Sequence, residues 1–251
     1  MLTGSGAWFN ERFRSPSARY SLYCFPFAGG SASYYASWAE FFTGAVELVP
    51  IQLPGRSPRM AELPATLIGD VADEVAGLIA ASARTQPLLF GHSMGAILAF
   101  EVAQRLQALR RPAGYLFLSG RPEPTVPRPQ TPFSTLPRRE FVQMLRDYGC
   151  ADEALLADDE ILDLLLPMMR ADFAMIEQYR HQPGPPLDCP ILAWCGSSDP
   201  EISPTTLMDG WNKETSARFE LLVRPGGHFF ITDCREEVAR AVHRAVTERP
   251  C

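Results

Sequence analysis

The sequence predicts an α/β fold with a mostly parallel central sheet and helices on both of its faces. Short apolar runs, typical of buried strands, alternate with longer segments whose apolar residues recur every three or four positions. Such alternation requires crossover connections, which make consecutive strands parallel and cover both faces of the sheet. One α/β domain with an insertion is therefore expected for the 251 residues.

The elements are expected in the following order. Strands are predicted at 20–27, 45–53, 87–92 and 114–119, and after an interruption at 190–196 and 219–224. Helices are predicted between them at 34–42, 67–83, 94–109, 204–211 and 236–247. The helix at 67–83 has a clear apolar stripe, formed by Ile68, Val71, Ala72, Val75 and Ile79.

The interruption at 121–188 predicts an insertion that divides the α/β core into 1–120 and 189–251. It begins with a proline-dense segment at 121–129, which cannot form a helix or a central strand. It closes with Pro-Gly-Pro-Pro at 183–186. The prolines indicate hinges between the insertion and the core.

The insertion itself is predicted to be helical, with segments at 138–148 and 159–179. The second has a broad face rich in Leu and Met, and Pro167 is expected to kink or split it. A hinged helical insertion here is expected to form a lid over the carboxyl edge of the sheet. The alternative is a helical subdomain that only packs on the core.

Composition and charge exclude several classes of function. The net charge of −6 argues against nucleic acid as a partner. No apolar run is long enough to span a membrane, and residues 1–17 lack the pattern of a signal peptide. A cytoplasmic protein that acts as a monomer, away from membranes, is expected.

Cysteine and histidine usage predicts neither disulfides nor a metal site. Free thiols are expected in a chain of this size without a secretory signal. The four histidines show no ligand spacing among themselves or with cysteine, so no metal is expected. No cofactor is expected either. The cysteines are Cys24, Cys150, Cys189, Cys195, Cys234 and Cys251.

The pentapeptide Gly91-His92-Ser93-Met94-Gly95 carries the strongest functional signal. A G-x-S-x-G between a strand and a helix predicts a nucleophile elbow, in which a strained turn exposes the serine hydroxyl at the edge of a sheet. Gly91 and Gly95 are expected where a Cβ would clash as strand and helix pack together. Ser93 is therefore the predicted nucleophile.

A serine hydroxyl needs a base, and His228 is the predicted one. It lies in a glycine-rich loop between the last predicted strand and the last helix. His92 is expected to project away from the nucleophile, whereas His181 lies in the exit linker of the insertion and His243 within the last helix.

The base needs an orienting carboxylate, and Asp199 is the predicted one. It lies in the turn after the strand at 190–196, so the order along the chain is Ser, Asp, His. Three other aspartates are less well placed: Asp188 precedes the strand, Asp209 lies in a helix and Asp233 lies beyond the base.

Two backbone N–H groups are expected to stabilise the developing oxyanion. One belongs to Met94, the residue after the nucleophile. The other should come from the loop after the first strand, where the N–H of Ala28 is the first choice and that of Phe27 the alternative. Gly29 and Gly30 keep this loop narrow.

Six segments in this order resemble the type II thioesterases of nonribosomal peptide and polyketide synthesis. They are spread over nearly the whole chain, at residues 8–9, 24–30, 52–56, 91–95, 118–121 and 226–230. The resemblance implies the α/β-hydrolase fold and Ser93, Asp199 and His228 as a catalytic triad. One departure is Ser57-Pro58-Arg59, where an acidic residue is commoner in the family.

The resemblance also implies a substrate and a partner. The substrate is an acyl group held as a thioester on the phosphopantetheine arm of a carrier protein, and its hydrolysis unblocks the synthase. The pathways would be those of antibiotics or of siderophores such as pyochelin. Arg110-Arg111 and Arg138-Arg139 are candidates for a basic patch that binds an acidic carrier, the alternative being solvated surface charges.

Three other functions are alternatives on the same fold. A carboxylesterase or lipase would cleave small free esters, and an acyltransferase would pass the acyl group to an alcohol or amine. A non-catalytic binding protein on the same fold would usually have lost the nucleophile or the base, and both Ser93 and His228 are present.

Overall fold

Six strands form one sheet in the order β2-β1-β3-β4-β5-β6 in the computed structural model, which describes residues 5–42, 44–82, 84–126, 132–149 and 153–248. All five neighbouring pairs are parallel. The strands are β1 (Tyr20–Phe25), β2 (Val46–Pro50), β3 (Gln86–His92), β4 (Tyr115–Ser119), β5 (Ile191–Gly196) and β6 (Phe219–Arg224). The predicted parallel α/β architecture is confirmed.

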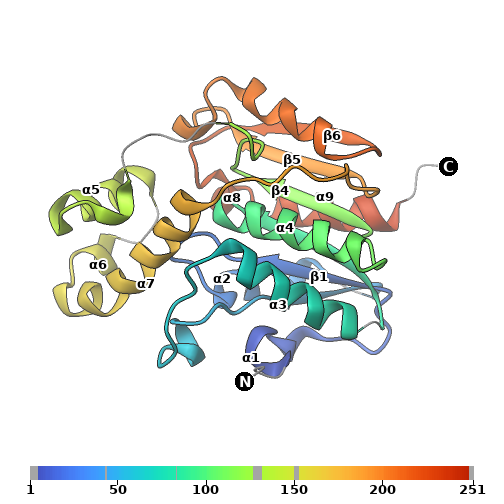
Figure 1. Cartoon of the computed structure of the whole chain (residues 1–251), viewed down its shortest axis with the longest axis horizontal. Helices are drawn as coiled ribbons and strands as arrows, with labels where there is room; N and C mark the ends of the chain where they lie inside the picture. The colour runs from blue at the N-terminus through green and yellow to red at the C-terminus, as the bar shows by residue number, and fades with distance from the viewer. Residues whose placement is uncertain (1–4, 43, 83, 127–131, 150–152, 249–251) are drawn as a thin grey trace.

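Helices cover both faces of the sheet (Figure 1). Side chains alternate along β1, so Tyr23 and Phe25 pack in one cluster with α3 (Ile68–Ala81) and α4 (Met94–Ala108). Leu22 and Cys24 face the opposite cluster. That second cluster also holds residues of α2 (Ala32–Ala36) and α9 (Arg235–Thr247).

The helices α5 (Arg138–Tyr148), α6 (Glu153–Leu156) and α7 (Asp159–Gln178) lie together at one end of the sheet (Figure 1). They all fall within the predicted insertion, between β4 and β5. The described residues also form two short α-helices, α1 (Ser5–Trp8) and α8 (Phe230–Asp233). Segments of 3₁₀ helix lie at Glu11–Phe13, Ala39–Phe41, Ser57–Arg59, Phe133–Thr135, Pro200–Ile202 and Thr205–Glu214.

Some predicted boundaries and the type of two predicted helices are wrong. The first strand ends at Phe25 rather than 27, because Pro26 has no N–H to continue the ladder. The single helix predicted at 34–42 is instead α2 followed by the 3₁₀ turn Ala39–Phe41. Its aromatic residues favour helix weakly and are held by packing, as Trp38 against Phe90 shows. The helix predicted at 204–211 is the 3₁₀ segment Thr205–Glu214.

Helix α7 runs through Pro167 without a break, so of the predicted kink or split the split is wrong. Proline removes one backbone hydrogen bond inside a helix. Buried side chains hold the helix on both sides of it, Leu162 and Leu166 before, and Met169 and Phe173 after. Tertiary packing of these side chains therefore outweighs the free energy lost with the missing hydrogen bond at Pro167.

The described residues contain no helix long and apolar enough to cross a membrane. They also contain no cluster of three or more His, Cys, Asp or Glu side chains that could hold a metal ion. Cys24, Cys189, Cys195 and Cys234 are free thiols. Cys150, Cys251, residue 83 of a predicted helix and residues 127–129 of the proline-dense segment lie outside the described residues.

Candidate active site

Ser93 occupies a strained turn between β3 and α4. Its φ of 53° and ψ of −116° lie in a region that residues other than glycine seldom adopt. The turn is held by a hydrogen bond from the Ser93 N–H to the Ser119 carbonyl at 2.8 Å, at the end of neighbouring β4. This is the geometry predicted for a nucleophile elbow.

Both glycines of the pentapeptide stand where a side chain cannot fit. A Cβ at Gly91 would lie 1.9 Å from the carbonyl oxygen of Gly95, and a Cβ at Gly95 would lie 2.2 Å from that of Phe25. These neighbours are backbone atoms, which cannot move aside as a flexible side chain could. The glycines therefore let α4 pack directly against β3 and β1.

Gly95→Ala is expected to lower the free energy of unfolding by about 1–3 kcal/mol or more, because the methyl group overlaps the backbone of β1. Gly77→Ala is the matched control, since Gly77 lies in α3 and a Cβ there would meet no atom within 4 Å. It should instead stabilise by about 0.5–1 kcal/mol, the helix preference of alanine over glycine. Urea unfolding measures both, and equal effects would contradict the steric explanation.

The structure brings Asp199 and His228 together. The Nδ1 of His228 lies 2.9 Å from Oδ2 of Asp199. Both residues are buried, His228 with 5% and Asp199 with 2% of its surface exposed. The other carboxylate oxygen, Oδ1, accepts the Glu201 N–H at 3.0 Å. Asp199 thus holds the imidazole with Nδ1 as donor, which leaves Nε2 to take a proton.

The loops that carry this pair are tied to each other. The Ser198 N–H donates to the Gly226 carbonyl at 2.9 Å, and the Ser197 N–H to that of Arg224 at 2.7 Å. A Cβ at Gly196 would lie 2.3 Å from the Gly227 carbonyl oxygen. Close contact after β5 and β6 therefore fixes the distance between the carboxylate and the imidazole.

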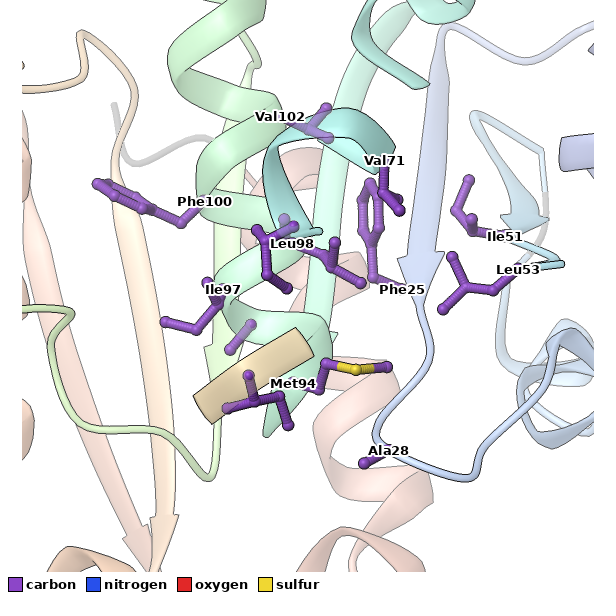
Figure 2. Close-up of a cluster of buried hydrophobic side chains, with 14 of the residues drawn as sticks. Phe25, Ala28, Ile51, Leu53, Val71, Met94, Ile97, Leu98, Phe100 and Val102 are labelled. Atoms are coloured by element: carbon purple, nitrogen blue, oxygen red, sulfur yellow. The ribbon is translucent and has the colours of Figure 1, made fainter. Parts of the chain in front are cut away.

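The two predicted oxyanion donors lie at the same end of a buried apolar cluster, Met94 on α4 and Ala28 on the loop after β1 (Figure 2). Within the described part of the chain, neither the Met94 N–H nor the Ala28 N–H donates to another protein group. The same holds for Phe27, so the choice between Ala28 and Phe27 stays a prediction. The Met94 N–H belongs to the first turn of α4, where the helix dipole favours negative charge.

His92 is buried beside the candidate base. Its Nδ1 lies 2.9 Å from the Ser119 hydroxyl, and its ring centroid is 5.1 Å from that of His228. Burial first, and the charge of His228 second, hold the pKa of His92 well below its ordinary 6.5. His92 is therefore neutral, and its Nδ1 is engaged by the Ser119 hydroxyl.

The pKa of His92 predicts a pH dependence of stability. Between pH 6.5 and the lower pKa of folded His92, the unfolded chain binds a proton at His92 that the folded protein does not, so stability falls as the pH falls through this range. His92→Asn, which keeps a polar atom near Ser119, should reduce this slope by up to about 1.4 kcal/mol per pH unit. Unfolding free energies of both proteins across this range test it, and parallel curves would contradict it.

The insertion contacts this site through side chains that local sequence patterns did not indicate. The ring of Tyr148, on α5, packs edge-on against His228 with centroids 5.8 Å apart. Asp172, on α7, is fully buried and bonded to Arg56 and to the Gly29 N–H. The sequence held one indication that Asp172 is special: this charged residue interrupts the apolar stripe of its helix, between Met169 and Ile176.

A parallel sheet with a serine elbow at its carboxyl edge, and an Asp–His pair on the loops after β5 and β6, defines an α/β-hydrolase. The family model of the thioesterase domain matches residues 20–246, and the chain belongs to the thioesterase family. The resemblance predicted from the sequence motifs is confirmed, and the chain is a thioesterase.

Relatives and solved structures agree with this assignment. The chain is 36% identical to thioesterase PikA5 of Streptomyces venezuelae, over 97% of this chain and 87% of that protein. It is 35% identical to gramicidin S biosynthesis protein GrsT of Aneurinibacillus migulanus, over 92% and 90%. The structure of the type II thioesterase BorB from the borrelidin biosynthetic cluster matches with a TM-score of 0.88 at 34% identity, over 96% of this chain and 98% of that one. The siderophore pathway stays a prediction.

Proposed function

We propose that this thioesterase hydrolyses acyl groups from the phosphopantetheine arms of carrier proteins in nonribosomal peptide or polyketide synthesis, through an acyl-Ser93 intermediate. The observation that carries the proposal is the buried Asp199–His228 pair, at 2.9 Å, on the same sheet edge as the strained Ser93 elbow. The names of the relatives PikA5, GrsT and BorB support the substrate class.

Acylation uses groups of this chain alone, and no cofactor is needed. His228 Nε2 takes the proton as Ser93 Oγ attacks the thioester carbon, and Asp199 stabilises the imidazolium through Nδ1–H. The carbonyl oxygen becomes an oxyanion that accepts the N–H groups of Met94 and Ala28. Collapse breaks the C–S bond, and the thiol leaves with the proton from His228.

Deacylation repeats these steps with water. His228 removes a proton from water as its oxygen attacks the acyl-Ser93 carbon, and then returns that proton to Ser93 Oγ. The products are a free acid and a carrier with a free thiol. A short or mixed acyl preference is part of the proposal and rests on analogy with the family.

The insertion at 121–188 is proposed to act as the lid. Its support is contact: Tyr148 packs on the proposed base, and α7 reaches the loop after β1 through Asp172. A carrier delivers its acyl arm from outside the enzyme, so the insertion must open for it or leave a path.

The carrier surface, the monomeric state and the cytoplasmic location stay part of the proposal. Arg138, one of the candidate cations, pairs with Asp159 at 2.8 Å and also with Asp163, both on α7. Its charge is thus balanced inside the insertion. Arg139 and the Arg110-Arg111 pair remain the better candidates for an acidic carrier.

Single-turnover release of radiolabelled acetyl from a loaded carrier protein tests the substrate class. The same enzyme is assayed with acetyl-N-acetylcysteamine and with p-nitrophenyl acetate. A higher kcat/KM for the carrier-bound thioester than for either small substrate is expected. Equal or faster cleavage of the free ester would favour a carboxylesterase instead, and acetyl transfer to an added alcohol or amine would favour an acyltransferase.

A further inference from the structure

A buried carboxylate on insertion helix α7 reaches the turn proposed to supply an oxyanion donor. Asp172 is fully buried, and its Oδ2 accepts the Gly29 N–H at 2.8 Å. The methionine one turn earlier, Met169, lies against the same glycine, since a Cβ at Gly29 would stand 2.9 Å from its terminal carbon. Helix α7 therefore touches the loop after β1 with both a polar and an apolar side chain.

Arg56, from the loop after β2, completes the contact. Its guanidinium donates to both oxygens of Asp172, at 2.6 and 2.7 Å, and Arg56 is 2% exposed. Nη1 of Arg56, which donates to Oδ2 of Asp172, also donates to the Gly30 carbonyl at 2.9 Å. Three segments far apart in the chain thus meet in one cluster, which fixes the N–H of Gly29 and the carbonyl of Gly30.

These two groups belong to the turn that contains Ala28. The Gly30 N–H donates to the Phe27 carbonyl at 2.8 Å, and Gly29 has a φ of 79°, which are features of a type II turn. Types I and II differ by a flip of the central peptide, here the one between Ala28 and Gly29. A flip would turn the Ala28 carbonyl toward the Asp172 carboxylate, so Asp172 stabilises one of the two arrangements.

Stability alone does not account for this cluster. Moving two charges out of water costs free energy that their attraction barely offsets, and well-packed apolar residues often stabilise a fold as well. An apolar pair could not accept the Gly29 N–H or donate to the Gly30 carbonyl. The ion pair therefore fixes the orientation of these two backbone groups. They belong to the loop after β1, where a displacement of about 1 Å can cost about 100-fold in rate.

We propose that Asp172 is a positioning residue, which acts through Arg56 and the Gly29 N–H to hold the turn that presents the Ala28 N–H. Helix α7 then completes the oxyanion site only while it is docked, which couples the insertion to catalysis. This inference rests on the proposed function of Ala28 and Ser93.

Steady-state kinetics of Asp172→Asn and Asp172→Ala with acetyl-N-acetylcysteamine give the first test. Asparagine retains one oxygen for the Gly29 N–H but loses the charge that pairs with Arg56. The expected kcat falls by about tenfold for Asn and more for Ala, short of the ~10²–10³ for loss of a whole oxyanion donor. KM should stay unchanged, since the interaction serves the transition state.

A trifluoromethyl ketone on the N-acetylcysteamine skeleton gives a readout that a purely structural role would not move. Ser93 Oγ adds reversibly to its carbonyl carbon, His228 takes the proton, and the oxygen becomes an oxyanion. The methyl ketone of the same skeleton binds without forming that charge to a comparable extent. Asp172→Asn should weaken the trifluoromethyl ketone about tenfold, in step with kcat, and leave the methyl ketone unchanged.

Glu47→Gln is the matched control. Glu47 on β2 is also a buried carboxylate, 1% exposed, that accepts from Arg14 at 2.7 Å and from a backbone N–H, that of Ser15, at 2.7 Å. Its neighbour in the sheet is Ser21, near the start of β1 and thus far from the carboxyl edge. Glu47→Gln should lower the melting temperature as Asp172→Asn does, but kcat and the affinities for both ketones should be retained.

Unchanged kcat in folded Asp172→Asn would overturn the inference. So would an equal loss of affinity for both ketones, or a loss of kcat in Glu47→Gln that matches its loss of stability. If Asp172→Ala does not fold, Asp172→Asn and Arg56→Lys still decide, since lysine keeps the charge without the two-pronged contact. Failure of the proposed function is separate, because it appears as a wild-type enzyme that releases no acetyl from the carrier.

Discussion

Ser93→Ala is expected to abolish release of acetyl from a carrier-bound thioester. Removal of a triad nucleophile lowers kcat by roughly 10⁶-fold, and the catalysis that remains comes from binding and oxyanion stabilisation. The fold should be retained, although alanine also disfavours the positive φ of 53° at this turn. Rapid-quench measurement of acetyl release, together with a melting curve, separates lost chemistry from lost structure.

The acyl-enzyme offers a second readout for the same variant. Wild-type enzyme quenched in acid during turnover should carry labelled acetyl on the peptide that contains Ser93, and Ser93→Ala should carry none. Ser197→Ala is the control, because Ser197 is an exposed serine just after β5, on the same sheet edge. Substantial turnover by Ser93→Ala, or loss of it in Ser197→Ala, would overturn the assignment of the nucleophile.

Asp199→Asn is expected to lower kcat by about 10⁴-fold, as loss of the carboxylate does in other serine triads. The asparagine amide can donate to Nδ1 of His228, which would put the imidazole proton on Nε2 and remove its capacity as a base. The Glu201 N–H, bonded to Oδ1 at 3.0 Å, can still be accepted by the amide oxygen. A loss of rate without unfolding is therefore expected.

Asp209→Asn and Asp188→Asn are the controls for Asp199. Both are exposed, and both were competing candidates for the orienting carboxylate. Neither variant should change kcat by more than about twofold, since surface substitutions away from a site usually cost little. A large loss in either of them, with Asp199→Asn still active, would reassign the carboxylate.

Prediction from sequence succeeded where the cause is local. The alternation of apolar runs and helical stripes predicted the parallel sheet, because each pattern reports which face of its own element is buried. The strain at Ser93 and the need for Gly91 and Gly95 were also predictable, because strand, turn and helix are contiguous. Errors fell at 34–42 and at Pro167, where packing outweighs local preference.

The sequence by itself determined the fold class and the elbow, and the order Ser, Asp, His along the chain led to Asp199 and His228 as the predicted carboxylate and base. Only the tertiary structure showed that these two side chains touch, 29 positions apart, and only it revealed the contact of Arg56 with Asp172, 116 positions apart. No local pattern predicts the second contact, because a side chain on one element meets its partner only after the fold has placed both. Local propensity thus specifies the elements, and long-range packing specifies their contacts at the site.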